Sequence, residues 1–392
     1  MPRWILFCLV LLLFLNESRP TVVRASVSRV DGAPTQPTFS TARCVAPCFT
    51  TQTLEPLRAL VQTSDLIIRG RVQTIHAFWR TDQRIIESNV TIAVAYTLLG
   101  DSSPQVTIRT VGGYLAAKEI GMVSPHAATF AVGEEVLLFA VQQEAGWRTV
   151  GGATGKFLVK GNQIINQDLA LAHSLEGLLP TVVELVKRRG LQTQLPTAWR
   201  HLTAWPVTQQ AQTLTAQSDK RRWATPHASA AFYLNLNTAQ MGDADGDHNA
   251  FRQAIVAAAN RWGAVADADF TLAYAGETNA TATGYNGVNE VLFMRKGSQE
   301  RAAAAQVWYT ADQTIVEADI WINEDYAWNA TGAPDADEVD LQSALLHEFG
   351  HWLILGHSAD GDAVMFARLT AGTLKRDLQP PDERGIRAIY PR

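Results

Sequence analysis

The chain has 392 residues, of which 47% are hydrophobic and 18% are charged, and its formal net charge is −5. At about 150 residues per domain, this length predicts two or three domains, each large enough to bury a core. The 38 acidic residues outnumber the 33 basic ones, and this balance excludes an electrostatic footprint for nucleic acid or for an anionic membrane. Three cysteines exclude a disulfide-dense small fold.

The N-terminus has the pattern of an export signal. Arg3 precedes an unbroken apolar run from Trp4 to Leu15, which is shorter than the roughly 20 residues that span a bilayer. Small residues precede an expected cleavage after Ala25. Residues 1–25 are therefore predicted to be a signal peptide and the mature protein to be secreted, without membrane contact. A buried N-terminal helix is the alternative.

The first half of the mature chain has β-strand patterns. Residues 26–40 are rich in Ser, Thr and Pro and predict a flexible leader. In residues 41–165, short apolar blocks alternate with Gly, Pro, Asn or Asp, as in a small β-barrel or sandwich. The expected strands lie at 66–72, 90–96, 106–111, 135–140 and 156–159. Residues 166–218 are predicted to be a helix, ending at Gly190, and a Gln- and Thr-rich linker.

The second half, residues 219–392, has interleaved strand and helix patterns. Strands are expected at 231–236, 270–274, 291–294, 306–309 and 315–323. Helices are expected at 249–262, 340–355 and 382–390, the last stopped by Pro391. Such an order predicts a sheet domain with helices packed against it.

The run His347-Glu348-Phe349-Gly350-His351 carries the clearest chemistry. Two histidines four residues apart project from one face of a helix, so both imidazoles can reach one ion. Glu348 lies beside that ion and can take a proton from a bound water. Because the helix is otherwise apolar, these polar groups would be costly to bury without a common partner. The spacing therefore predicts a zinc site.

A catalytic zinc needs a third protein ligand and one open position for water. His357 can reach the metal only if the helix ends between His351 and His357. In the metzincin pattern HExxHxxGxxH a glycine makes that turn, but here the position is Ile354, which resists positive φ. Zinc binding can carry this strain, or Gly356 can absorb the turn. A gluzincin arrangement, with Glu383 as third ligand, is the alternative.

Met365 follows His357 by eight residues, in Ala363-Val364-Met365-Phe366. Together with the run 315–323, these motifs resemble the matrixin branch of the metzincins, the matrix metalloproteinase fold, over about residues 220–392. The resemblance implies an α+β domain with a twisted mixed sheet and three helices. It also implies one catalytic zinc, Met365 as the hydrophobic base beneath it, and 315–323 as the edge strand along which a substrate lies.

This resemblance implies a secreted zinc-dependent endopeptidase that hydrolyses peptide bonds of extracellular proteins. Its chemistry would use metal-activated water with Glu348 as general base. The alternative is a catalytically weak or inactive zinc-containing binding module, because Ile354 replaces the turn glycine. The segment 366–373, after Met365, is expected to form the wall of the specificity pocket.

Residues 41–165 are similar, more weakly, to an OB-like barrel and to the barrel of tissue inhibitors of metalloproteinases. One hypothesis is an inhibitory or chaperoning prodomain, removed by cleavage near Lys220-Arg221-Arg222; the other is a spacer or binding module. Cys44 and Cys48 faintly resemble the cysteine-switch segment of matrixins. A local disulfide between them is the favoured interpretation.

Asp243, Asp245 and Asp247 alternate with small residues ahead of the expected helix 249–262. Closely spaced carboxylates are ligands that Ca²⁺ accepts, but the glycine and the final acid of an EF-hand loop are not in their places. A polar turn that caps the following helix is the favoured interpretation, and calcium binding stays the alternative.

Overall fold

The computed structural model describes residues 51–166, 168–169, 171–190, 220–224, 226–237, 245–297 and 300–392. All of them belong to one compact unit, Pro47–Arg392. The predicted signal peptide 1–25, the leader 26–40, Cys44, Cys48, the linker 191–218 and Asp243 lie outside the described residues. Within the described ranges, no helix combines the length and the apolar character that crossing a membrane requires.

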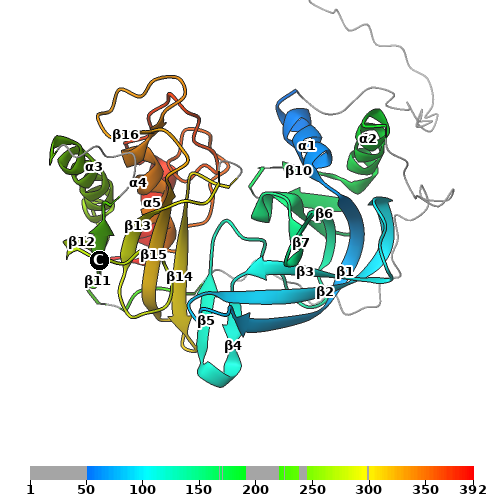
Figure 1. Cartoon of the computed structure of the whole chain (residues 1–392), viewed down its shortest axis with the longest axis horizontal. Helices are drawn as coiled ribbons and strands as arrows, with labels where there is room; N and C mark the ends of the chain where they lie inside the picture. Colours follow the sequence, from blue (N-terminus) through cyan, green and yellow to red (C-terminus); the bar gives the residue numbers. More distant parts are fainter. Residues whose placement is uncertain are drawn as a thin grey trace, which may run out of the picture. The chain divides into compact units, whose positions relative to one another are not determined.

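The region from residue 51 to 188 is built mainly of strands, with a helix at each end of the segment. Its elements are α1 (Thr51–Thr63), β1 (Leu66–Trp79), β2 (Ile86–Leu99), β3 (Gln105–Val111), β4 (Gly113–Leu115), β5 (Ile120–Val123), β6 (Glu135–Gln143), β7 (Gly146–Thr149), β8 (Lys156–Lys160), β9 (Gln163–Asn166), β10 (Leu171–Ser174) and α2 (Leu175–Arg188), with short 3₁₀ turns at Ala116–Lys118 and Gly152–Gly155. Helices α1 and α2 contact each other (Figure 1).

Five of these strands pair in a closed ring, β1–β2–β3–β7–β6–β1. Only β3 and β7 run parallel in this ring. Leu66, Ile68 and Val72 of β1 pack inside it, whereas Ile67 points to a second core beneath α1 and α2. Because the start of β1 is buried on both faces, it opens with three consecutive apolar residues, Leu66-Ile67-Ile68, rather than with an alternating pattern.

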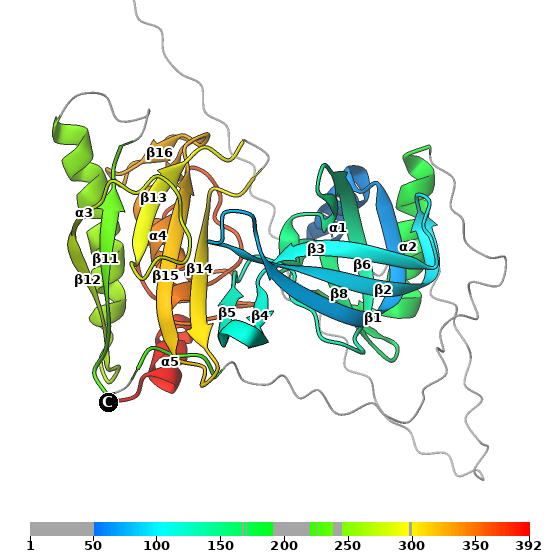
Figure 2. The same ribbon diagram turned by 60° about the horizontal axis from the view of Figure 1, so that its bottom comes forward.

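The second region, from residue 220, contains a mixed sheet and helices. Its elements are β11 (Ala228–Asn235), α3 (Asp245–Gly263), β12 (Phe270–Glu277), β13 (Glu290–Met294), β14 (Ala303–Thr310), β15 (Ile315–Asn323), β16 (Trp328–Asn329), β17 (Val339–Asp340), α4 (Leu341–Trp352) and α5 (Pro380–Ile389). Strands β11, β12, β13 and β15 are parallel, and β14 is antiparallel to β15. This arrangement (Figure 2) agrees with the predicted α+β domain of mixed sheet and three helices.

The prediction that 315–323 is an edge strand is wrong. The sheet order is β12-β11-β13-β15-β14-β5-β4, so β15 lies between β13 and β14. Because a short turn at 311–314 folds β14 back against β15, the hairpin leaves β14 as the outermost strand of this region. The next strand in the order, β5, comes from the first region and pairs antiparallel with β14.

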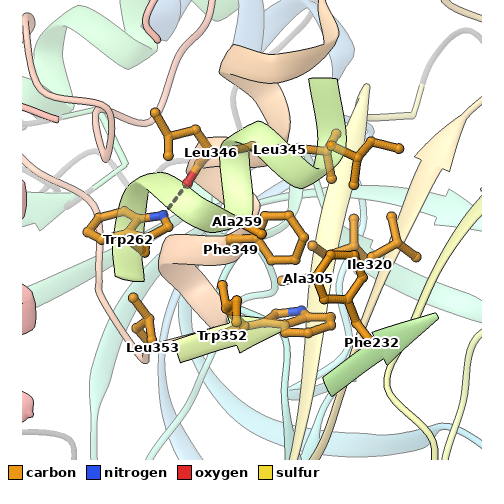
Figure 3. Packing of buried hydrophobic residues seen from close by; sticks show 14 of the residues in the cluster. Phe232, Ala259, Trp262, Ala305, Ile320, Leu345, Leu346, Phe349, Trp352 and Leu353 are labelled. Carbon is orange, nitrogen blue, oxygen red and sulfur yellow. Dashed lines mark hydrogen bonds between the residues drawn. The ribbon is translucent and has the colours of Figure 1, made fainter. Parts of the chain in front are cut away.

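Helices α3 and α4 share one aromatic core with the sheet (Figure 3). Phe232 of β11 contacts Phe349 and Trp352 of α4, with ring centroids 5.2 and 6.2 Å apart. The indole nitrogen of Trp262, on α3, donates to the carbonyl of Leu346 at 2.8 Å. These contacts fix α4 along its length, and α4 is the element that carries the HExxH residues.

Candidate metal centre

Helix α4 begins at a buried cap. The carboxylate of Asp340 accepts hydrogen bonds from the backbone N–H of Ser343 at 2.9 Å and from its hydroxyl at 2.6 Å. This is the capping geometry that satisfies the first free N–H groups of a helix. Arg376 pairs with the same carboxylate, so the buried charge is neutralised. The start of α4 is therefore rigidly placed.

Helix α4 ends at Trp352, three residues earlier than the predicted Leu355, because the chain turns at Ile354. Ile354 has φ of 63°, in the left-handed region, and Gly356 has no positive φ. The N–H groups of Leu353 and Leu355 both donate to the carbonyl of Gly350, at 3.1 Å. The β-branched residue thus makes the turn itself, at a cost of about 1–2 kcal/mol.

This turn brings His357 back to His347 and His351. Each of the three rings has its Nδ1 held by an acceptor: Val364 O for His347 at 2.8 Å, Leu355 O for His351 at 2.8 Å, and Asp168 Oδ1 for His357 at 2.9 Å. A donated Nδ1–H leaves Nε2 as the bare nitrogen, which is the usual arrangement of metal-ligating histidines.

A fourth histidine, His126, lies in the same cluster. One ring nitrogen of each of the four histidines lies within 4.8 Å of those of the other three. Three of the buried ring nitrogens, His126 Nδ1, His351 Nε2 and His357 Nε2, have no hydrogen-bond partner among the described residues. Buried polar atoms are ordinarily paired. The donor set and its unpaired nitrogens therefore fit a zinc ion.

Glu348 is buried beside the histidines, and both of its oxygens are engaged. Oε1 lies 3.1 Å from Nε2 of His126, and Oε2 accepts the N–H of Ala305 at 2.8 Å. Burial alone would raise the pKa of this carboxyl, but His126, His347 and the two hydrogen bonds lower it overall. Glu348 is consequently ionised at neutral pH.

Burial also sets the protonation of the histidines. It lowers the pKa of His347 to about 4, and it lowers the pKa values of His126 and His351 below their usual value. Nearby histidines add to the effect on His347 and His351. Since metal ions bind the neutral form of imidazole, these three histidines are ready to ligate at neutral pH.

Met365 packs directly against α4. A methyl group on Gly350 would overlap the sulfur of Met365 and would lie 2.8 Å from Trp262 Cζ2. Only glycine therefore fits at this position, between His347 and His351. The N–H groups of Val364 and Met365 donate to the buried carboxylate of Asp382 on α5, at 2.9 and 3.0 Å. Sequence reasoning missed Asp382, although it starts the predicted third helix.

A cavity of about 470 Å³ opens beside His347 and Glu348. Residues 366–371 form part of its lining, which agrees with the expectation that the segment after Met365 makes a pocket wall. His126 also lines it, as do Arg301 and Tyr326. The cavity has the size of a site for a single side chain or small ligand.

Other candidate residues lie apart from the cluster. Glu383 accepts a hydrogen bond from Arg387 on the same helix at 2.8 Å and is not part of the metal-binding group found among the described residues. The alternative with Glu383 as third ligand is therefore wrong. Helix α3 begins at Asp245, but the side chains of Asp245 and Asp247 are outside the described set, and the calcium alternative stays a prediction.

His126 could not have been found from the sequence. It is a single histidine in a β-rich segment, 222 residues before Glu348, and no spacing rule connects it to the HExxH run. The same holds for Asp168, which lies 189 residues before His357.

The second region is similar to a known protein family. Residues 228–391 match the M10 peptidase family described as matrixin. A metalloendoproteinase 5-MMP of Arabidopsis thaliana is 44% identical over 57 residues, covering 14% of this chain and 16% of that protein. Metalloendoproteinase 1 of Glycine max is 40% identical over 70 residues, covering 17% and 23%.

Metalloendoproteinase 2-MMP of Arabidopsis thaliana is 36% identical over 74 residues, covering 18% of this chain and 20% of that protein. The chain thus matches these relatives over only 16–23% of their own lengths. Residues 228–391 of this chain form a matrixin-like domain of the metzincin type.

Proposed function

We propose that this protein is a zinc-dependent endopeptidase that is secreted and acts on extracellular proteins or peptides. The observation that carries the proposal is the convergence of His347, His351 and His357 on one point, with Glu348 beside them, in a matrixin-like domain. The relatives named metalloendoproteinases support the same reaction class. Secretion is supported by the pattern of residues 1–25.

In this proposal His347, His351 and His357 hold one zinc ion through Nε2. When bound, zinc polarises the carbonyl of the scissile bond and lowers the pKa of a water molecule towards 7. The acceptors on the three Nδ1 atoms fix the orientation of the rings and raise their basicity. Met365, packed against Gly350, gives the cluster an apolar base.

Glu348 is the general base. Its carboxylate takes a proton from the attacking water as the carbon–oxygen bond forms, and it returns that proton to the leaving amine as the carbon–nitrogen bond breaks. The hydrogen bond from Ala305 N–H to Oε2 holds the carboxylate in place while Oε1 faces the histidines. Such proton transfer contributes typically 10²–10⁴-fold to the rate.

The cavity beside His347 supports a peptide substrate. It would receive one substrate side chain, and the segment 366–371 would select which one. An extended peptide would gain main-chain hydrogen bonds along β14, the outermost strand of the second region.

The binding-module alternative has less support, because Ile354 takes the left-handed conformation and His357 still joins the cluster. The OB-like barrel is supported by the ring order β1–β2–β3–β7–β6 with its parallel β3–β7 pair. Cleavage near residues 220–222 is also part of the proposal. The backbone of Arg222 forms hydrogen bonds with the backbone of Gln313 and of Ile315. Cleavage of the peptide bond before Arg222 would leave these hydrogen bonds in place.

The proposal is tested by measuring bound zinc and casein hydrolysis in the wild type and in Glu348→Gln, both as purified and after limited trypsin treatment. We expect about one zinc per chain in both proteins and a loss of at least about 100-fold in hydrolysis for the variant. Glu383→Gln, a change on the surface of α5, is the control and should retain activity. Hydrolysis that survives Glu348→Gln would overturn the mechanism.

A further inference from the structure

His126 joins the proposed zinc site from the first region. It follows β5 in sequence, and its ring centroid lies 4.9 Å from that of His351, 5.1 Å from that of His357 and 5.8 Å from that of His347. The residue is 6% exposed, so its imidazole is almost fully removed from solvent. A buried imidazole among three others needs a shared partner.

The two ring nitrogens of His126 have different surroundings. Nε2 lies 3.1 Å from Oε1 of Glu348, the geometry in which Nε2–H donates to the carboxylate. A neutral imidazole that is protonated at Nε2 has a bare Nδ1, and this atom is buried without a hydrogen-bond partner among the described residues. The bare nitrogen is thus available to the same ion as the other three histidines.

The backbone that precedes His126 lies along β14. Ile120–Val123 of β5 pair antiparallel with Val307–Thr310, and the hydroxyl of Ser124 donates to the carbonyl of Ala305 at 3.1 Å. Without β5, β14 would be the open edge at which an extended peptide can add as a further strand. The segment 120–126 therefore occupies the edge that the proposed substrate would use.

Two further contacts hold the first region at this site. Ile120 and Met122 of β5 pack with Trp308 of β14 in a small core that also includes Ile86 of β2. Asp168, between β9 and β10, accepts the Nδ1–H of His357 at 2.9 Å. The first region thus orients one histidine of the second region and places another imidazole beside it.

We propose that His126 is a fourth protein ligand of the zinc ion and that segment 120–126 blocks the peptidase site in the intact chain; the second half of this statement rests on the proposed function. Four protein ligands make a closed zinc site, whereas a catalytic zinc keeps one position open. His126 also engages the oxygen of Glu348 that faces the histidines. Both the metal position and the base are then withheld from a substrate.

The test uses the full chain loaded with Co²⁺ in place of zinc, because the visible spectrum of Co²⁺ reports its ligands. Acetohydroxamate is titrated into wild type, His126→Ala and the control His76→Ala, which removes an exposed histidine from β1 of the same region. We expect the spectrum of His126→Ala to change at acetohydroxamate concentrations at least tenfold below those needed for wild type and for His76→Ala.

Zinc affinity and casein hydrolysis are measured on the same proteins. We expect His126→Ala to bind zinc at least tenfold more weakly than wild type and to hydrolyse casein at least tenfold faster without trypsin treatment. His126→Gln serves as a second variant if the alanine protein does not fold, since its amide can donate to Glu348 while being a poor zinc ligand.

Equal acetohydroxamate titrations and equal zinc affinities in wild type and the His126 variants would overturn the ligand assignment. A changed spectrum with no rise in hydrolysis would overturn the blocking role, provided that trypsin-treated wild type is active. If none of the proteins hydrolyses casein under any condition, the proposed function fails, and the ligand assignment is still decided by the spectrum.

Discussion

The two regions of the chain contribute to the candidate site in different ways. The second region supplies His347, His351 and His357 from one short segment, and their orientation comes from a helix and one turn. The first region supplies His126 from the segment between β5 and β6, and Asp168 from the segment between β9 and β10. A local motif can therefore build most of a metal site, whereas closing that site requires side chains that only the tertiary fold brings near.

The largest expected effect is that the second region loses stability when zinc is removed, whereas the first region does not. Removing zinc with a chelator should destabilise the second region, because metal-binding free energy of order 10 kcal/mol contributes to its folding. The interior of the strand ring contains no site of this kind among its described residues. Hydrogen exchange should rise in peptides from α4 and β15 more than in peptides from β1 and β6. Equal rises in all four would contradict this difference.

A smaller effect on stability is expected at the contact between α5 and the backbone of Val364 and Met365. Asp382→Ala removes the acceptor of two buried N–H groups, those of Val364 and Met365, and should lower the free energy of unfolding by about 4 kcal/mol. Urea denaturation measures the change. Glu383→Ala, at the neighbouring, partly exposed position, is the matched control and should cost under about 1 kcal/mol.

A carboxyl group in the sheet of the second region, that of Glu317 on β15, should make the stability of the protein depend on pH. Burial raises the pKa of Glu317 to about 7, against a usual value near 4.5. Between these values the folded state retains a proton that the unfolded state has lost. The contribution of Glu317 to the free energy of unfolding should therefore fall as pH rises from about 4.5 to 7, by up to about 1.4 kcal/mol per unit, or about 3 kcal/mol over the range, whereas the buried histidines, whose pKa values are lowered, contribute in the opposite direction.

Urea denaturation at several pH values tests this slope. Glu317→Gln removes this contribution, because the amide does not titrate, so the difference in free energy of unfolding between wild type and this variant should change by about 3 kcal/mol from pH 4.5 to 7. The difference for Glu277→Gln, an exposed position on β12, should not change with pH. A difference between wild type and Glu317→Gln that does not change with pH across this interval would show that Glu317 does not bind a proton in the folded state.

The smallest expected effect concerns the turn at Ile354. At φ of 63° a residue without a Cβ is favoured, so Ile354→Gly should be more stable than Ile354→Ala by about 1 kcal/mol. Comparing the two variants with each other removes the common loss of the isoleucine side chain. A more stable alanine variant, measured by thermal denaturation of the zinc-loaded proteins, would mean that the turn carries no strain at this residue.

Many elements could be predicted from periodicity alone. The strand at 315–323 matches β15, and the helix predicted over 382–390 differs from α5 by two residues at its start. Other elements lacked such a signal. Helix α1 contains Pro56, and β4 and β5 are too short for a clear alternation, so none of these three elements was expected. The end of α4 was misplaced because an isoleucine in the left-handed conformation is contrary to its backbone preference.

The sequence by itself determined the matrixin-like motif, because helical periodicity and the spacing from His347 to His357 are local properties of the chain. It also determined that a turn must fall near residue 354. Only the tertiary structure decided that β14 is the outer strand of the second region, that β5 pairs with β14 and that His126 forms a hydrogen bond with Glu348. These contacts join residues far apart in sequence, and their partners are selected by packing and strand pairing, which no local pattern encodes.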